Sequence, residues 1–332
     1  MTDVVLTALQ LPDFGMPTVE PRIPAGVFQA RCAAALERAA SAGFDVLVVY
    51  GDREHFANIA YLTNYDPRFE EALLILRAGH KPTLLVGNEG WSYANIVPYE
   101  INVILYQSFS LLAQPRGDSL SLAEIFDLCG IGADTRVGVA GWKYFDERKT
   151  DTPDSWLEVP SYLVDTLRQL TGDSSCVSNA TSLFMNPVDG LRIINEVDQL
   201  AAFEFAACHS SQSVRNVIFG LKPGMTEYET VRLMQLNGIP HSVTLMLSSG
   251  ERTSLGLASP SSRVIQQGDP FVTAFGLWGA LNCRAGFVVK DADQLPENIH
   301  DYVDKLVVPY FRAVAEWYET VGIGVTGGDL FA

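Results

Sequence analysis

The sequence has few basic residues: Lys and Arg total 23 against 39 Asp and Glu, which gives a formal net charge of −16. Nucleic acids and anionic membrane surfaces are bound through basic patches that neutralise phosphate groups. No run of Lys or Arg occurs anywhere in the chain. We therefore expect neither a nucleic-acid partner nor a membrane partner.

Paired cysteines are also missing. The five cysteines are odd in number and widely spread, and no Cys-x-x-Cys pair occurs among them. Disulfide frameworks and zinc knuckles are built from paired cysteines, so neither is indicated, and we interpret these as buried thiols in a reducing compartment. The first residues lack the basic and apolar regions of a signal peptide, and no apolar run approaches the ~20 residues of a membrane span. The sequence predicts a soluble cytoplasmic protein.

The length and the apolar content favour two domains. Single hydrophobic cores rarely grow beyond about 250–300 residues, and 48% of these 332 residues are hydrophobic. Prolines at positions 12, 17 and 21 disfavour regular secondary structure, so we expect residues 1–23 to form an extended arm. From 24 to 189, helical and strand patterns follow one another, which indicates an α/β domain with a mixed sheet flanked by helices.

The pattern breaks around Gly190, where we place the domain boundary. A long helix is expected from about 195 to 221, and Thr226 with Glu229 forms a capping box for the next helix, which should end at Gly238. Strands are expected at 242–247, 271–277 and 280–289. A last long helix should follow, with a kink at Pro309. Residues 190–332 thus form an α+β domain.

Several motifs carry a resemblance to a known family. They are the segment 191–196 before the long helix, the Gly-Leu-Lys-Pro-Gly-Met-Thr-Glu turn of 220–227, and Ser249-Gly250 placed nineteen residues before Gly268-Asp269. These residues resemble the pita-bread family of creatinase, prolidase and aminopeptidase P. The stretch 58–64, Asn-Ile-Ala-Tyr-Leu-Thr-Asn, is similar to the creatinase-type N-terminal domain. The resemblance implies that α/β domain followed by a pita-bread domain, here incomplete and truncated.

The resemblance also implies a two-metal site whose ligands are replaced here. The family uses two Asp, one His and two Glu, because two adjacent cations need negative charge around the water that they activate. Under the resemblance the first Asp falls at Ala274, and the second at Cys283, or at Asn282 if the register slips by one. The pocket histidine falls at Leu257, and the other ligands would fall beyond Ala332. We expect no dinuclear metal site and no cofactor.

Other residues are candidates for a ligand pocket. Arg68, in the loop 65–71, corresponds under the resemblance to an arginine that binds a substrate carboxylate across a dimer. Its alternative role is a salt bridge to Glu70 or Glu71. Arginines near aromatic walls suit a small carboxylated ligand. The further candidates are His241, Arg252, Trp278, Cys283 and Arg284. Each has a structural alternative, and neighbouring strand residues such as Cys283 and Arg284 should point to opposite faces.

Three functions are compatible with this sequence, and no catalytic residue is assigned. The first is a divergent, non-dinuclear C–N hydrolase of the prolidase and creatinase type. The second is a catalytically inactive pseudopeptidase that binds a small ligand or peptide, and the third is an interaction scaffold. The expected ligand is a small amide, a dipeptide or a carboxylated small molecule. The resemblance further implies a homodimer.

Overall fold

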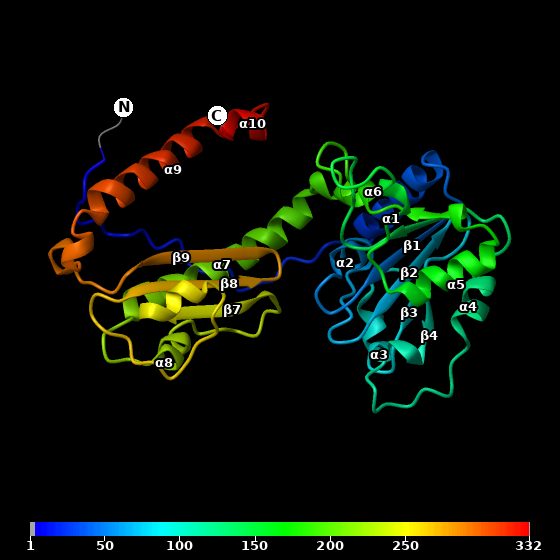
Figure 1. The fold of residues 1–332 in the computed structure, drawn as a ribbon, viewed down its shortest axis with the longest axis horizontal. Coiled ribbons are helices and arrows are strands. Elements are labelled where there is room, and N and C mark those ends of the chain that lie inside the picture. Colours follow the sequence, from blue (N-terminus) through cyan, green and yellow to red (C-terminus); the bar gives the residue numbers. More distant parts are fainter. Residues whose placement is uncertain (1–3, 332) are drawn as a thin grey trace. The chain divides into compact units, whose positions relative to one another are not determined.

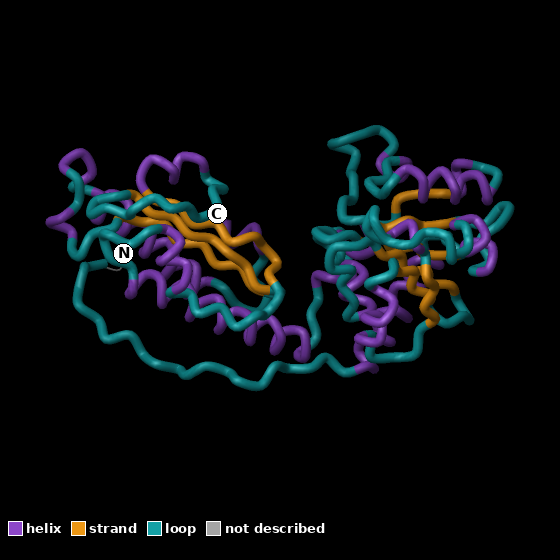
Figure 2. The backbone as a smooth tube through the Cα atoms, turned by 90° about the horizontal axis from the view of Figure 1, so that it is seen from below, coloured by secondary structure: helices purple, strands orange, loops and turns teal. Residues whose placement is uncertain are grey.

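The computed structural model describes residues 4–331 and divides the chain into two compact units (Figure 1). One unit comprises Arg22–Leu200, and the other joins the residues up to Pro21 with those from Ala201 on. The division falls inside the long helix α7 (Val197–Gly220), and the expected domain bounds stay a prediction. The chain before residue 25 contains no helix or strand over its described residues (Figure 2).

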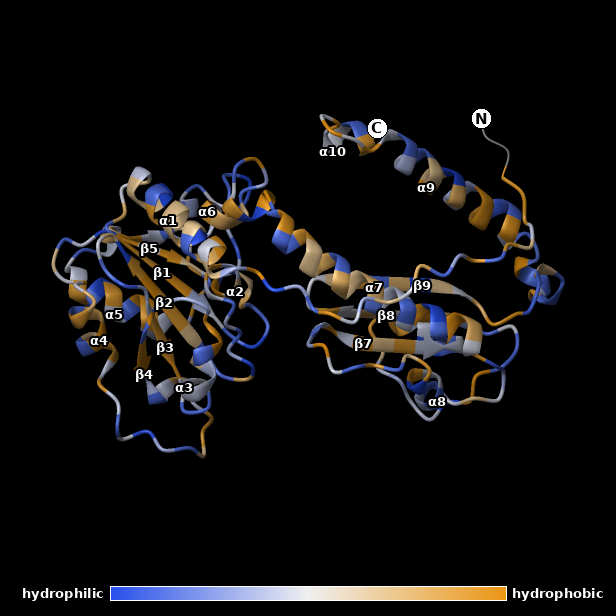
Figure 3. Ribbon diagram, turned by 180° about the vertical axis from the view of Figure 1, so that it is seen from behind, coloured by the Kyte–Doolittle hydropathy of each residue, from blue (hydrophilic) through white to orange (hydrophobic). Residues whose placement is uncertain are grey.

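A six-stranded mixed sheet forms the centre of the unit Arg22–Leu200. Its spatial order is β4-β3-β2-β1-β5-β6, in which β2 is antiparallel to both of its neighbours and the other pairs are parallel. The strands are β1 (Val46–Gly51), β2 (Ala72–Arg77), β3 (Thr83–Val86), β4 (Asn102–Leu105), β5 (Val137–Ala140) and β6 (Val177–Asn179). Every residue of β1 is buried, and the central strands are apolar along their length (Figure 3). This is the composition of strands covered on both faces.

Helices cover both faces of this sheet. They are α1 (Ala25–Ser41), α2 (Ala57–Thr63), α3 (Gly90–Tyr93), α4 (Leu122–Leu128), α5 (Ser161–Thr171) and α6 (Ser182–Met185). Helices α1, α2 and α6 pack with Leu47 and Val49 of β1 in one core, whereas α4 and α5 pack with Val46 and Val48 in the other. The alternation of inward side chains along β1 thus assigns each helix to a face.

A three-stranded antiparallel sheet forms the centre of the second unit, in the order β7-β8-β9. Its elements are α8 (Glu227–Arg232), β7 (His241–Ser249), β8 (Pro270–Leu277), β9 (Ala280–Phe287), α9 (Val308–Thr320) and α10 (Gly327–Phe331). Phe271, Phe275 and Leu277 of β8 are buried in one core with Val214 and Val217 of α7. Helix α7 therefore covers one face of this sheet.

The capping box of α8 is present in both directions, since Thr226 and Glu229 bond reciprocally. One local prediction is wrong. Helix α8 ends at Arg232 and not at Gly238, because Gln235 takes a left-handed backbone with φ of 52°. At Pro309, where a kink or break was expected, the helix changes type: the π-helical turn Val303–Val307 continues directly into α9, and Pro309 lies in the first turn of α9.

None of the helices between residues 4 and 331 combines the length and the apolar character that crossing a membrane requires.

Candidate functional site

The face of the sheet that α7 leaves uncovered carries Ala274 and Cys283, the two positions at which the resemblance leads us to expect metal ligands. Phe271, Thr273 and Phe275 of β8 are fully or almost fully buried on the helix side. Because strand side chains alternate, Ala274 points to the other face. Ala274 lies directly opposite Cys283 of β9 and opposite Met246 of β7. These three residues form a row across the sheet.

The two neighbours Asn282 and Cys283 point to opposite faces. The side-chain amide of Asn282 donates hydrogen bonds to Ser210 Oγ at 2.9 Å and to Ser211 Oγ at 3.2 Å, and both serines belong to α7. Asn282 is therefore on the helix side, while Cys283 is exposed on the open side. Of the two positions that the sequence left open for the second Asp, only Cys283 faces Ala274.

The row of Met246, Ala274 and Cys283 offers a thioether, a methyl group and a thiol. Hard divalent cations prefer oxygen ligands, which this row does not supply. Between residues 4 and 331, moreover, no three His, Cys, Asp or Glu side chains are grouped closely enough to hold a metal ion.

Two of the predicted candidates belong to the helix side of the same sheet. Arg284 lies opposite the buried Thr273, and its guanidinium donates to the carbonyl oxygen of Cys283 at 2.7 Å. His241 begins β7 opposite Leu277, and its ring centroid is 6.1 Å from that of Phe275. Neither side chain shares the open face with the Cys283 thiol.

Arg252 is held by a buried carboxylate. Glu227 is fully buried and accepts hydrogen bonds from the N–H and Oγ of Ser249 at 2.8 Å, from the N–H and Oγ of Ser261 at 2.9 and 2.7 Å, and from Arg252. Burial alone would raise the pKa of Glu227, but these hydrogen bonds together lower it below its ordinary value. Arg252 also donates to the Ser259 carbonyl at 2.8 Å. The arginine thus fixes the segment that follows β7.

The remaining positions of this unit lie in connecting segments. Leu257, where the resemblance led us to expect the pocket histidine, is 79% exposed after a 3₁₀ segment. The backbone N–H of Trp278 donates to the Pro240 carbonyl at 2.8 Å, which fixes the turn from β8 to β9. That turn needs Gly279, because its φ is 104° and a Cβ there would lie 2.8 Å from the Phe203 ring.

Arg68 belongs to the other unit and is held in place by two neighbours. Its Nε lies 3.1 Å from Asp66 Oδ1, its Nη2 donates to Tyr93 Oη at 2.9 Å, and its guanidinium stacks 4.9 Å from the Tyr93 ring centroid. The Arg68 backbone has a left-handed conformation with φ of 58°. Despite its two partners, the Arg68 side chain is 48% exposed. Burial raises the pKa of Asp66, and the charge of Arg68 partly offsets this.

The expected salt bridge from Arg68 to Glu70 or Glu71 is wrong. Glu70 is buried and accepts from the backbone N–H groups of Glu89 at 3.2 Å and Gly90 at 2.9 Å. Glu71 accepts from the hydroxyls of Tyr50 at 2.6 Å and Tyr162 at 3.2 Å. Both carboxylates thus accept hydrogen bonds from other groups of the same unit. The ion-pair partner of Arg68 is Asp66.

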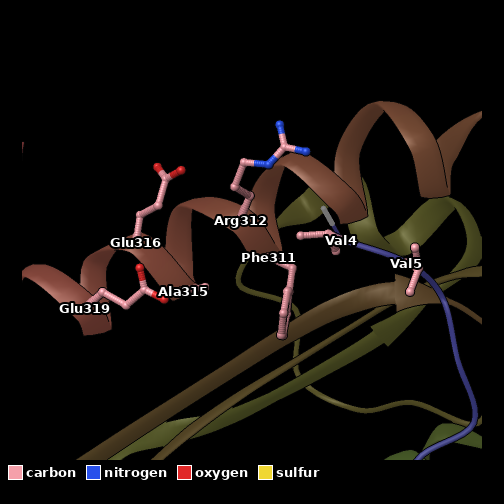
Figure 4. A pocket seen from close by; sticks show the side chains of 7 residues that line it. All are labelled: Val4, Val5, Phe311, Arg312, Ala315, Glu316 and Glu319. Atoms are coloured by element: carbon pink, nitrogen blue, oxygen red, sulfur yellow. The ribbon is translucent and has the colours of Figure 1, made fainter. Parts of the chain in front are cut away.

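A shallow hollow of about 230 Å³ lies between the first described residues and α9 (Figure 4). Its lining side chains are Val4, Val5, Phe311, Arg312, Ala315, Glu316 and Glu319. None of the sequence-predicted site residues contributes to it.

The sequence analysis missed one contact between aromatic rings. His55, which follows β1, stacks on Trp142, which follows β5, with ring centroids 4.1 Å apart. The available signal was that both residues come just after buried strands.

Comparisons with known proteins cover most of the chain in solved structures. No family model and no curated protein matches the sequence. Solved structures do match. A prolidase from Pyrococcus horikoshii OT3 has a TM-score of 0.65 at 16% identity, covering 91% of this chain and 75% of that one. This chain has the fold of the prolidases. An X-Pro aminopeptidase from Thermotoga maritima MSB8 gives 0.61 at 13% identity, covering 85% and 70%, and a dipeptidase from Mycobacterium ulcerans gives 0.58 at 18%, covering 90% and 71%.

The expected fold class is thereby confirmed. The chain has an α/β N-terminal part and a pita-bread part that is incomplete relative to these solved structures, since it spans 75% of the first of them. At these identities the likeness concerns the fold, and function depends on the residues of the site.

Proposed function

We propose that this protein binds a small carboxylated molecule, of which a dipeptide is the simplest case, and does not catalyse two-metal hydrolysis. The second part rests on the row of Ala274, Cys283 and Met246, which presents no carboxylate where two are needed. The first part rests on one observation, the fixed and exposed guanidinium of Arg68.

The geometry of Arg68 favours a role in recognition. A left-handed backbone costs a residue with a Cβ about 1–2 kcal/mol, and such strain concentrates at functional positions. Asp66 and Tyr93 hold the guanidinium on one side, while almost half of the side chain stays exposed. A planar guanidinium that is oriented in advance binds a carboxylate with two parallel hydrogen bonds. This supports a carboxylate as the recognised group.

The solved structures of the same fold suggest the rest of the ligand. Several carry the names prolidase, Xaa-Pro dipeptidase or X-Pro aminopeptidase. We therefore choose Xaa-Pro dipeptides as the first ligands for this chain. On the resemblance alone we further propose a homodimer in the cytoplasm.

Calorimetric titration with Ala-Pro and with its C-terminal amide tests this proposal. We expect Ala-Pro to bind, and we expect both the amide and the Arg68→Gln variant to weaken binding about tenfold or more, the effect of one lost charge-assisted hydrogen bond. Arg148→Gln is the matched control, because Arg148 is also exposed and paired to an aspartate, Asp146. Equal binding of the acid and the amide would overturn the proposal.

One observation favours a second candidate function, a divergent hydrolase. Cys283 exposes a thiol at a position where the family resemblance puts a metal ligand, and a thiol can act as a nucleophile. Turnover of Xaa-Pro dipeptides or creatine by the metal-free protein, abolished in Cys283→Ala, would establish this candidate. Turnover that survives in Cys283→Ala would exclude it.

A further inference from the structure

The edge strands of the two sheets differ in how they are protected against pairing with another chain. Backbone groups at a sheet edge can bind a further strand, and proteins prevent this with short edge strands, bulges, proline or charged residues. In the six-stranded sheet, the edge strands β4 and β6 have only 4 and 3 residues. In the three-stranded sheet, β7 has two register shifts, and the N–H of its Leu247 donates to the Ala258 carbonyl at 3.1 Å.

Strand β9 lacks such protection. It runs for 8 residues, Ala280–Phe287, in unbroken register with β8, and it contains no proline, lysine or acidic residue. Within residues 4–331, no strand pairs with its other side (Figure 1). Its exposed residues are Leu281, Cys283, Arg284 and Ala285. The free edge of β9 is therefore open to another strand.

The turn from β8 to β9 decides which backbone groups of β9 point outward. The turn has two residues, so Leu277 and Ala280 form a hydrogen-bonded pair. From there, bonded and outward-pointing residues alternate along β9. The outward-pointing residues are Leu281, Cys283 and Ala285. In agreement, the Cys283 carbonyl accepts a hydrogen bond from the Arg284 guanidinium at 2.7 Å and not from β8.

The charge of β9 favours a second copy of the same chain as its partner. With a net charge of −16, two copies repel each other over most of their surface. Strand β9 has no acidic side chain and one basic side chain, Arg284, so two copies can meet there without opposing carboxylates. Two identical antiparallel strands are related by a two-fold axis, the commonest symmetry of protein dimers.

The position of the two-fold axis follows from the side chains. Outward-pointing residues must face one another, so the axis passes through a residue of β9. An axis through Arg284 would set two arginines directly opposite each other, and opposed like charges are destabilising. An axis through Asn282 would shorten the pair, because β9 begins at Ala280. The remaining central choice is an axis through Cys283.

The register about Cys283 brings complementary side chains together. It sets Arg284 opposite Asn282 of the second copy. The Asn282 amide nitrogen donates to two serines of α7 at 2.9 and 3.2 Å, so its amide oxygen can accept from that arginine. On the open face, Leu281, which is 65% exposed, lies opposite Ala285 of the second copy. This register leaves no like charges opposed.

We propose that β9 pairs with β9 of a second copy, antiparallel and centred on Cys283. The two three-stranded sheets then form one continuous sheet. The two Cys283 Cα atoms lie about 5.5 Å apart, which is within the range that a disulfide can bridge. This interface assigns a surface to the homodimer proposed above, and it does not depend on the ligand proposed for Arg68.

Analytical ultracentrifugation and thiol cross-linking of the full chain test the proposal. We expect a dimer. Copper–phenanthroline in air should oxidise the two Cys283 thiols to one disulfide, with dioxygen taking up the electrons, and give a product of twice the chain's mass that is missing in Cys283→Ala.

A pair of substitutions at Ala285 tests the backbone pairing itself. Ala285→Pro removes an outward N–H and leaves the ladder to β8 intact. It should raise the dissociation constant of the dimer about tenfold or more, because two backbone hydrogen bonds are lost by symmetry. It should also abolish the disulfide, although Cys283 is unchanged. Ala285→Ser keeps the N–H and is the matched control, which should dimerise and cross-link like the unmodified chain.

Three results would overturn the proposal. A monomer at on the order of 100 μM would leave the edge of β9 to an extended segment of another protein. A dimer whose dissociation constant is unchanged in Ala285→Pro would keep the homodimer but reject β9 as its interface. A dimer of the unmodified chain that forms no Cys283 disulfide would reject the register, and this measurement does not depend on the folding of any variant.

Discussion

Ala274 and Cys283 lie directly opposite each other on β8 and β9, on the face of the sheet that α7 does not cover. Directly opposed side chains on antiparallel strands are about 4.5–5.5 Å apart at Cβ, close enough for two carboxylates to share a metal pair. Here a methyl group and a thiol occupy that place. The two opposed positions therefore supply no carboxylate.

The Cys283 thiol should react faster than the other four. Cys32 is buried and Cys129 is partly buried, and burial raises the pKa of both thiols, which lowers their thiolate fraction. Cys283 is exposed. We expect one fast phase with a thiol-specific chromogenic reagent at pH 7.5, missing in Cys283→Ala. A fast phase that persists in this variant would place the exposed thiol elsewhere.

Neighbouring substitutions on β9 should differ in their effect on stability. Asn282→Ala removes the donor to the fully buried Ser210 hydroxyl and should lower the free energy of unfolding by about 1–2 kcal/mol. Cys283→Ala changes an exposed side chain and should alter it by less than about 0.5 kcal/mol. Urea unfolding measures both. A larger loss in the cysteine variant would contradict the assignment of the two faces.

Glu227 should make the free energy of unfolding depend on pH in the acidic range. Its folded pKa is lowered, so its contribution is present above the ordinary glutamate pKa of about 4.3 and is lost as the pH falls through the folded value. Glu227→Gln should cost roughly 3–5 kcal/mol at pH 7, because Arg252 and two serines lose a buried anionic partner. Unfolding at several pH values should show this difference shrinking below about pH 4.

A matched control exists on the same helix. Glu229 also lies in the first turn of α8, but it is exposed and bonds to Thr226 in the capping box. Glu229→Gln should have a smaller effect at pH 7 than Glu227→Gln. Equal losses in the two variants would argue against the buried carboxylate as the centre of this loop arrangement.

Arg68→Gly should separate stability from binding. Glycine relieves the backbone strain of φ 58°, but a cation–π contact is lost and the buried carboxylate of Asp66 loses its cationic partner. We expect the free energy of unfolding to fall by about 1–3 kcal/mol, which leaves the protein folded, and dipeptide binding to disappear. Asp134→Gly, at φ 61° in another turn, is the control that should keep full binding.

Elements with a strong local signal were predictable from the sequence. The long helix α7, the capping box of α8 and the strands β7, β8 and β9 follow from apolar periodicity and capping residues. The end of α8 was not, because a left-handed residue such as Gln235 carries no distinctive sequence signal. Short elements such as α2 depend on tertiary packing, in which Ile59 and Leu62 join a core built from distant strands.

Within the candidate site, the sequence could predict the direction of a side chain only where the residue lies on a strand. Opposite directions for Cys283 and Arg284 follow from strand alternation. The contact from Arg252 to Glu227 and the stack of His55 on Trp142 join residues far apart in the sequence. Such contacts arise from the fold as a whole, and no local pattern encodes them.

The most direct test of the central claim is the metal content of the purified protein after incubation with Mn²⁺, Co²⁺ and Zn²⁺, measured by elemental analysis after dialysis. Because Ala274 and Cys283 supply no carboxylate on the open face of the sheet, we predict no stoichiometric pair of bound ions and the same result in Cys283→Ala. Two tightly bound ions per chain would contradict the account.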